Sequence, residues 1–129
     1  MRLILDTHIL LALLTERLLV VAPSVARALG ERDVDACASV ESLWEIAMKT
    51  RLGKLDPGMS LDLLPESLET MGVGMLPITA SHALAPIEPL PPTRDPFDRL
   101  LLAQCALENR QLVTIDRALV GHPLAARFD

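Results

Sequence analysis

The stretch RLILDTHILLALLT, residues 2–15, decides the fold that the sequence predicts. Its first part, RLILD, is a short apolar run that does not alternate with polar residues, which is typical of a strand covered on both faces. The part that follows, THILLALLT, has the length and composition of a helix. A strand that leads directly into a helix is the starting unit of a parallel α/β domain.

Strand and helix patterns go on alternating after this unit. Further strands are expected at residues 34–39, 73–79, 111–116 and, at an edge, 124–128. Helices are expected at residues 23–32, 40–55, 61–72, 80–90, 95–110 and 117–123. Gly53 should end the second of these helices and Pro65 should kink or split the third, whereas residues 16–22 read as a loop. The alternation predicts one α/β domain over residues 1–129, a three-layer α/β/α structure around a central, mainly parallel sheet.

Composition limits the partners that this chain could bind. The formal net charge of −5 and the pI near 5.1 give no overall basic field, so nucleic acid would have to bind through a local patch. One Trp, two Phe and no Tyr leave little surface for base stacking, so backbone phosphates are the expected target.

The cysteines and the first residues bear on where the protein acts. Cys37 and Cys105 lie in apolar segments without metal-type spacing, which favours buried thiols of a reducing compartment over a disulfide. The apolar start is interrupted by Asp6 and His8 and is too short for a membrane span or an export signal. We therefore expect a soluble, cytoplasmic protein with no membrane contact.

Two acids stand at the carboxyl ends of predicted strands, where ligands bind in open parallel sheets. Asp6 closes the first strand and Asp116 closes the strand at 111–116. Each could equally be the N-cap of the next helix, so neither alone indicates a site.

A third and a fourth acid lie close together in TRDPFDRLLLAQ, residues 93–104. Asp95 reads as an N-cap, Pro96 as the first helical residue, and Asp98 as an acid that faces the positive end of the helix. Helix-end chemistry alone would account for both acids.

The predicted helix at 40–55 carries two more acids, one turn apart. Glu45 lies among apolar neighbours, and its simplest role would be an i, i+4 ion pair with Lys49. Glu41 reads as surface charge and ranks below Glu45 as a candidate for function.

Five motifs in the order in which they occur here resemble the PIN-domain ribonucleases, and among them the VapC-type toxins of bacterial toxin–antitoxin pairs. The motifs are LILDTHILLALL (3–14), SLWEIAMKTRLGKL (42–55), LPITASHAL (76–84), RDPFDRLLLAQ (94–104) and LVTID (112–116). The resemblance implies a three-layer α/β fold with a small acidic pocket that holds Mg²⁺ or Mn²⁺ and hydrolyses RNA phosphodiester bonds. It also implies two protein partners, a cognate antitoxin and a second copy of the chain in a homodimer.

The resemblance assigns roles to the residues at matching positions. The implied catalytic and metal-binding acids are Asp6, Glu45, Asp98 and Asp116. Asp95 would stand at the pocket rim, and Thr7 and Ser42 would lie next to the metal. Ile115 stands where many relatives have an arginine, with Arg117 as the candidate replacement.

The chemistry of magnesium agrees with such a set of acids. Mg²⁺ takes oxygen ligands and keeps several waters, so one or two direct carboxylates suffice while other acids bind its waters. Without the ion, acids brought together would raise one another's pKa.

Basic residues near the acids are candidates for contacts with RNA phosphates. The nearest in sequence are Arg94, Arg99, Arg117 and Lys49, with Arg51 and Lys54 on the same predicted helix as Lys49. His8 is interpreted as a structural histidine rather than a general base, and Trp44 as a core or partner-surface residue.

Half of the residues are hydrophobic, which also suggests an apolar surface for protein partners. Leu10, Leu11, Leu13 and Leu14 are expected on a helix close to the surface, in excess of what a small core needs. We expect a homodimer, and an antitoxin helix over an apolar groove beside the acidic pocket.

Other functions fit the sequence less well. A phosphate-receiving signalling domain would need an acidic pair after the first strand and a lysine at the end of a late strand, and a nucleotide-binding enzyme would need a Gly-rich loop after a strand. A non-catalytic PIN-like module that binds RNA or a partner stays open as the alternative, with the acids as helix caps. A metal titration separates it from a nuclease.

Overall fold

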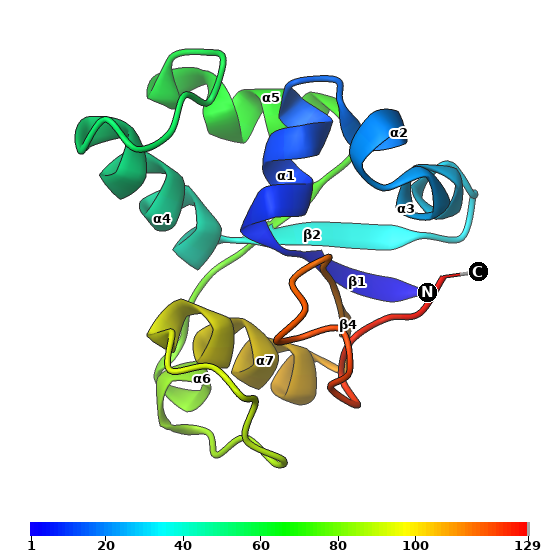
Figure 1. Cartoon of the computed structure of the whole chain (residues 1–129), viewed down its shortest axis with the longest axis vertical. Coiled ribbons are helices and arrows are strands. Elements are labelled where there is room, and N and C mark those ends of the chain that lie inside the picture. The colour runs from blue at the N-terminus through cyan, green and yellow to red at the C-terminus, as the bar shows by residue number, and fades with distance from the viewer. Residues whose placement is uncertain (129) are drawn as a thin grey trace.

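The computed structural model describes residues 1–128 and has a four-stranded parallel sheet at its centre (Figure 1). The strands are β1 (Arg2–Leu5), β2 (Asp35–Ser39), β3 (Gly74–Leu76) and β4 (Gln111–Val113), in the spatial order β3-β2-β1-β4. The helices are α1 (Thr7–Leu14), α2 (Leu18–Val21), α3 (Pro23–Leu29), α4 (Val40–Arg51), α5 (Leu64–Thr70), α6 (Ala80–Leu84) and α7 (Pro96–Glu108), with a 3-10 helix η1 (Leu61–Leu63).

Helices cover both faces of this sheet. α1, α2, α3 and α5 lie on one face, and α6 and α7 lie on the other (Figure 1). The side chains of β1 follow this division, because Leu3 and Leu5 join the core on the first face and Ile4 joins the core on the second. All three are fully buried, which explains why the run does not alternate with polar residues. The predicted three-layer α/β/α fold is confirmed.

Helix boundaries follow the signals in the sequence at three points. Asp95 caps α7 by accepting a hydrogen bond from Phe97 N at 2.9 Å. α4 ends at Arg51, two residues before Gly53, which has a φ of 72°. The segment with Pro65 is split into η1 and α5, as predicted.

Three predicted segments differ from the structure. Residues 16–22 are not all loop, since α2 forms there around the buried Leu18. Residues 117–123 make hydrogen-bonded turns instead of a helix, because Gly121 and Pro123 follow the first turn directly. The predicted edge strand at 124–128 is reduced to a parallel bridge between Leu112 and Ala125.

The leucines of α1 are more buried than expected. Leu10 and Leu14 are 0% and 6% exposed and belong to the core on the α1 face, together with Leu18 of α2 and Leu64 of α5. The prediction of a position close to the surface is therefore wrong for these two leucines, because neighbouring helices cover them, whereas Leu11 and Leu13 are half-buried.

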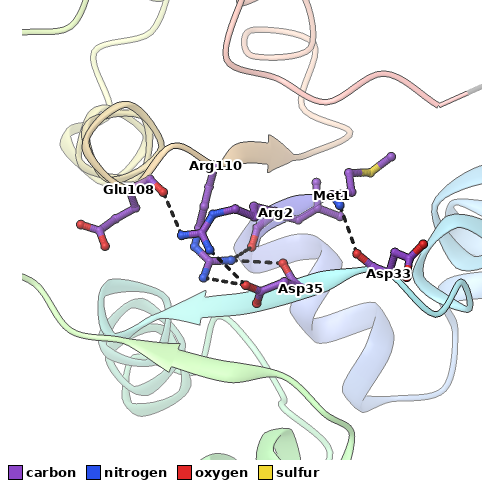
Figure 2. A network of polar contacts seen from close by, with 7 residues as sticks. Met1, Arg2, Asp33, Asp35, Glu108 and Arg110 are labelled. Atoms are coloured by element: carbon purple, nitrogen blue, oxygen red, sulfur yellow. Dashed lines mark hydrogen bonds and ion pairs between the residues drawn. The ribbon is translucent and has the colours of Figure 1, made fainter.

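A polar network fastens the amino end of the sheet, as Figure 2 shows. Arg110 donates to the carbonyl oxygens of Leu3 and Asp35 at 3.2 and 3.1 Å and pairs with the Asp35 carboxylate at 3.2 Å. Arg2 contacts the same carboxylate at 3.4 Å and donates to Glu108 O at 3.1 Å. These contacts join β1, β2 and the end of α7 to one another. They lie at the amino ends of the strands, opposite the end at which Asp6 follows β1.

The cysteines and the hydrophobicity of the helices bear on two further expectations. Cys37 and Cys105 are buried free thiols, as predicted, and burial raises the pKa of Cys105 to about 12. In the part of the chain that the structure describes, no helix has both the length and the apolar character that a membrane span requires.

Candidate active site

Asp6 lies where β1 ends and α1 begins, and both of its carboxylate oxygens are held. Oδ1 accepts from Thr7 N at 2.8 Å, which makes Asp6 the N-cap of α1, and Oδ2 accepts from the Thr114 hydroxyl at 2.7 Å. The side chain is buried, and burial raises its pKa more than the two hydrogen bonds and the nearby His8 lower it.

Thr114 also belongs to this arrangement, although the sequence analysis did not single it out. Its hydroxyl donates to Asp6 and accepts from Asp116 N at 3.0 Å, so it joins the segment after β4 to the end of β1. The signal for it was the Thr and Asp that follow the apolar run of β4, at the same edge of the sheet as Asp6.

α4 directs polar side chains toward Asp6. Ser39 caps this helix by accepting from Glu41 N at 3.0 Å, and Glu41, Ser42 and Glu45 are all buried on its inner face. The Thr7 hydroxyl lies 2.9 Å from Glu45 Oε1 and 3.0 Å from the Ser42 hydroxyl. Thr7, Ser42 and Glu45, singled out from the sequence, are thus in direct contact.

Lys49 lies beside Glu45 in the i, i+4 pair that the sequence allowed. Its Nζ is 2.6 Å from Glu45 Oε2, and this hydrogen bond raises the pKa of Lys49. Lys49 therefore compensates one buried acid.

Asp98 stands near three of the other acids. It is half-buried in the first turn of α7, where the Thr93 hydroxyl donates to its Oδ2 at 3.3 Å. Burial, followed by the charges of Asp95, Asp6 and Asp116, raises the pKa of Asp98 to about 7. Parts of the chain that are far apart in sequence thus place their acids within electrostatic reach of one another.

Asp116 lies beyond β4 and is half-buried. Its Oδ1 accepts from Ala118 N at 2.9 Å, so it caps the turns that follow. Asp6, Asp95 and Asp116 each accept a backbone N–H, which is the capping role that the sequence allowed for them.

Glu41 is the largest departure from the sequence analysis, which took it for surface charge. Its side chain is 0% exposed, and burial, then the charges of Glu45, Asp6 and Asp95, raise its pKa to about 8. Its position one turn before Glu45, on the same helix face, was the available signal. Glu41 faces the acids and not the solvent.

The donors fit a hard divalent cation. Within residues 1–128, no three His, Cys, Asp or Glu side chains are already close enough to hold a metal ion among themselves. Carboxylates and hydroxyls are nevertheless the oxygen donors that Mg²⁺ takes, and Mg²⁺ keeps several waters of its own. Glu41 Oε1 is buried without a hydrogen-bond partner among the described residues, which leaves an acceptor for such an ion or its water.

The predicted basic residues take different positions. Arg94, Arg117, Arg51 and Lys54 are exposed. Arg99 donates to Thr93 O at 3.1 Å and lines a depression of about 440 Å³ between α6 and α7, whose lining includes none of the acids discussed above.

His8 and Trp44 are the remaining residues near the candidate site that the sequence analysis singled out. His8 is exposed, because the apolar residues that follow it in sequence turn to the core while His8 faces solvent. Its interpretation as a structural histidine rather than a general base stays a prediction. Trp44 is 58% exposed and meets Phe97 edge to face with ring centroids 5.3 Å apart. It is therefore a surface residue and not part of the core.

Comparison with known proteins agrees with this architecture. The family model described as PIN domain matches residues 3–121, a range that includes both helical layers and all the acids discussed above. No curated protein and no solved structure matches the chain. PIN domains are typically nucleases, and they generally use divalent metal ions. Since the match spans nearly the whole chain, the protein belongs to the PIN-domain family.

Proposed function

We propose that this protein is a Mg²⁺- or Mn²⁺-dependent endoribonuclease that acts in the cytoplasm as the toxin of a toxin–antitoxin pair, like the VapC-type proteins that it resembles. One observation carries the nuclease proposal. Acids from the end of β1, from α4, from the start of α7 and from the segment after β4 lie within electrostatic reach of one another, and their charges add to burial, the larger cause, in raising the pKa of Glu41 and Asp98. Such crowding of negative charge is stabilised by a bound divalent cation.

In this proposal Asp6, Glu45, Asp98 and Asp116 hold the ion, directly or through its waters, and Asp95 stands at the rim. When bound, the ion supplies an activated water and stabilises charge on the leaving oxygen of a phosphodiester. Hydrogen bonds from Thr7 to Glu45 and from Thr114 to Asp6 fix the two carboxylates in place, and Ser42 completes the hydroxyl contacts of Thr7.

RNA contacts are assigned to side chains around the acids. Arg94, just before Asp98 in sequence, and Arg117, just after Asp116, are both exposed. They are the first candidates for phosphate contacts. Arg99 and Lys49 follow, because both have partners within the protein.

An apolar surface beside the acids supports the proposed antitoxin. Ile115, next to Asp116, is 44% exposed and borders two depressions of about 380 and 360 Å³. Leu11 and Val21 line the first, and Val25 and Val120 line the second. An amphipathic antitoxin helix could bury its apolar side there and cover the acidic pocket.

The test is cleavage of single-stranded or looped RNA by protein freed from any antitoxin. Cleavage should occur with Mg²⁺ or Mn²⁺, stop in excess EDTA and return when the ion is restored. A double variant with Asp6→Asn and Asp98→Asn, prepared in the same way, controls for contaminating nucleases. Cleavage that persists in chelator, and that the double variant lacks, would contradict the metal-dependent mechanism.

The alternative, a non-catalytic module, is favoured by the capping contacts of Asp6, Asp95 and Asp116. Caps do not need a metal ion. In this alternative Mn²⁺ would leave the melting temperature unchanged, whereas in a metal-dependent nuclease Mn²⁺ binding to the folded state raises it.

A further inference from the structure

Glu41 is a fully buried carboxylate that the protein itself only half satisfies. Its Oε2 lies 3.5 Å from the Ser42 hydroxyl, a long contact, and its Oε1 has no partner within residues 1–128. Native proteins pair nearly all buried polar atoms, so such an oxygen needs an explanation.

Glu41 is joined to the candidate active site through two hydroxyls. Ser42 Oγ lies 3.0 Å from Thr7 Oγ1, which lies 2.9 Å from Glu45 Oε1. Each hydroxyl has one proton, so the pair supplies two protons to four carboxylate oxygens. Lys49 donates to Glu45 Oε2, and Glu41 Oε1 has no donor among the described residues.

A purely structural role does not account for this placement. An acid in the first turn of a helix stabilises the helix from the solvent, but Glu41 is 0% exposed. The charges that act on it, Glu45, Asp6 and Asp95, have the same sign. A buried water could satisfy Oε1, but a water would not offset the accumulated charge.

We infer that Glu41 is a further cation-binding carboxylate of this site, which offers its unpartnered Oε1 to the divalent ion or to the ion's water shell. The inference rests on the proposed function, because it presumes that the acids bind a divalent ion. It adds a residue that the resemblance does not assign, and it makes α4 the source of two acids instead of one.

Mn²⁺ binding at neutral pH tests the inference, measured by calorimetry and by the shift of the melting temperature after removal of EDTA. Glu41→Gln keeps the shape of the side chain and removes its charge. We expect Mn²⁺ to bind this variant about 10- to 100-fold more weakly than the wild type, as is typical when an outer ligand is lost. In EDTA the variant should melt at the same temperature as the wild type or higher, since folding no longer has to protonate an acid or bury its charge among other acids.

Two further variants make the result specific. Glu69→Gln removes an exposed acid from α5 and should bind Mn²⁺ like the wild type. Asp98→Asn reports on the proposed function itself. If the wild type binds Mn²⁺ and Asp98→Asn weakens it while Glu41→Gln does not, the role of Glu41 is wrong and the nuclease proposal stands. If the wild type binds no Mn²⁺, both are wrong.

Glu41→Asp decides the question should Glu41→Gln not fold. It keeps the charge but draws the carboxylate back by one methylene. Weaker Mn²⁺ binding than in the wild type would support the inference, and unchanged binding would overturn it.

Discussion

At the scale of single residues, Asp95 and Asp98 divide two tasks between neighbouring positions of one helix start. Asp95 accepts the Phe97 N–H and fixes where α7 begins. With that start fixed, Asp98 in the first turn is half-buried and close enough to Asp95, Asp6 and Asp116 for their charges to raise its pKa. A helix cap thus sets the direction in which the next acid points.

Substitution of these two acids should separate capping from metal binding. Asp95→Ala should lower the free energy of unfolding by about 1 kcal/mol, with or without metal, because a cap is lost. Asp98→Asn should keep or raise the melting temperature in EDTA, shrink the stabilisation gained from Mn²⁺, and reduce RNA cleavage by orders of magnitude. Thermal melts and cleavage rates of both variants provide the measurement. An Asp98→Asn protein with normal cleavage and the full metal shift would leave Asp98 as a helix-end residue only.

The two strongest pKa shifts predict how stability changes with pH in the absence of metal. Folding raises the pKa of Glu41 from 4.5 to about 8 and that of Asp98 from 3.8 to about 7. Between the unfolded and folded values the folded state holds more protons, so its stability should fall as the pH rises from about 4 to 8. Taken in full, the two shifts would lower the free energy of unfolding by about 5 kcal/mol between pH 5.5 and pH 8 in EDTA, and because solvent screens the half-buried Asp98 we expect about 2–4 kcal/mol.

Urea unfolding at the two pH values measures this difference. Saturating Mg²⁺ should flatten or reverse it, because the ion binds the deprotonated acids. Glu41→Gln should remove the larger part of it. A wild type that becomes more stable between pH 5.5 and pH 8 in EDTA would contradict the shifts.

How far the sequence predicted these residues depends on what each helix packs against. Thr7, Ser42 and Glu45 were singled out by resemblance, and the structure brings them into contact. Glu41 was predicted to lie on the surface because hydrophobic residues are expected on the buried face of a helix and acids on the exposed face. On α4 these acids are buried instead. Its Trp44 is 58% exposed while its acids are buried. A helix that turns acids inward cannot be oriented by hydrophobicity alone.

At the scale of elements, the candidate site depends on how β4 is joined to β1. The backbone N–H of Asp6 donates to Val113 O at 2.9 Å, which continues the parallel pairing of the two strands. One residue later, the Thr114 hydroxyl bridges Asp6 and Asp116. The strand pair thus determines the relative position of two acids that are far apart in the chain.

Loss of the Thr114 hydroxyl should therefore affect both stability and metal binding. Thr114→Val keeps the volume but leaves Asp6 Oδ2 and Asp116 N without this partner, at a cost of about 1–3 kcal/mol in the free energy of unfolding. Mn²⁺ affinity should fall by about 10- to 100-fold, because the support of a ligand is lost. Thr114→Ser, which keeps the hydroxyl, is the matched control and should bind Mn²⁺ nearly as the wild type does. If Thr114→Val binds Mn²⁺ as well as Thr114→Ser, the bridge does not position Asp6.

The type of an element was predictable where the hydrophobic pattern agrees with residues that start or end helices. The four parallel strands follow from apolar runs, and the start of α7 follows from Asp95 and Pro96. The ends of strands were less predictable, because pairing stops where the neighbouring strand stops. β4 ends at Val113, and the residues up to Asp116 belong to the site instead of the sheet. α2 escaped prediction because four residues carry too little periodicity to show a helix.

At the scale of the whole molecule, the two ends of the sheet are built differently. At the amino end Arg2 and Arg110 share the carboxylate of Asp35 and bind backbone carbonyls, so opposite charges are paired. At the carboxyl end acids gather, with Lys49 compensating Glu45. One end joins the parallel strands through paired charges, whereas the other brings like charges together, which is the basis of the proposed cation site.

We propose that the protein forms a homodimer, as the resemblance implies, through exposed apolar side chains of α2. Leu10 and Leu14 are buried and cannot form its interface, but Leu19 and Val20 of α2 are 68% and 77% exposed. Exposed apolar side chains of this size next to one another are typical of a surface that a partner covers. We predict that light scattering at micromolar concentration gives twice the chain mass of 14.1 kDa.

Charged substitutions locate the interface of this dimer. Leu19→Glu combined with Val20→Glu should convert it to a monomer without loss of melting temperature in the monomer, because neither side chain belongs to the core. Leu84→Glu is the matched control, since Leu84 is 83% exposed on α6, which lies on the opposite face of the sheet from α2 (Figure 1). It should remain a dimer. A wild type that is monomeric at this concentration would contradict the dimer, and a dimer that survives the double substitution would exclude α2 as its interface.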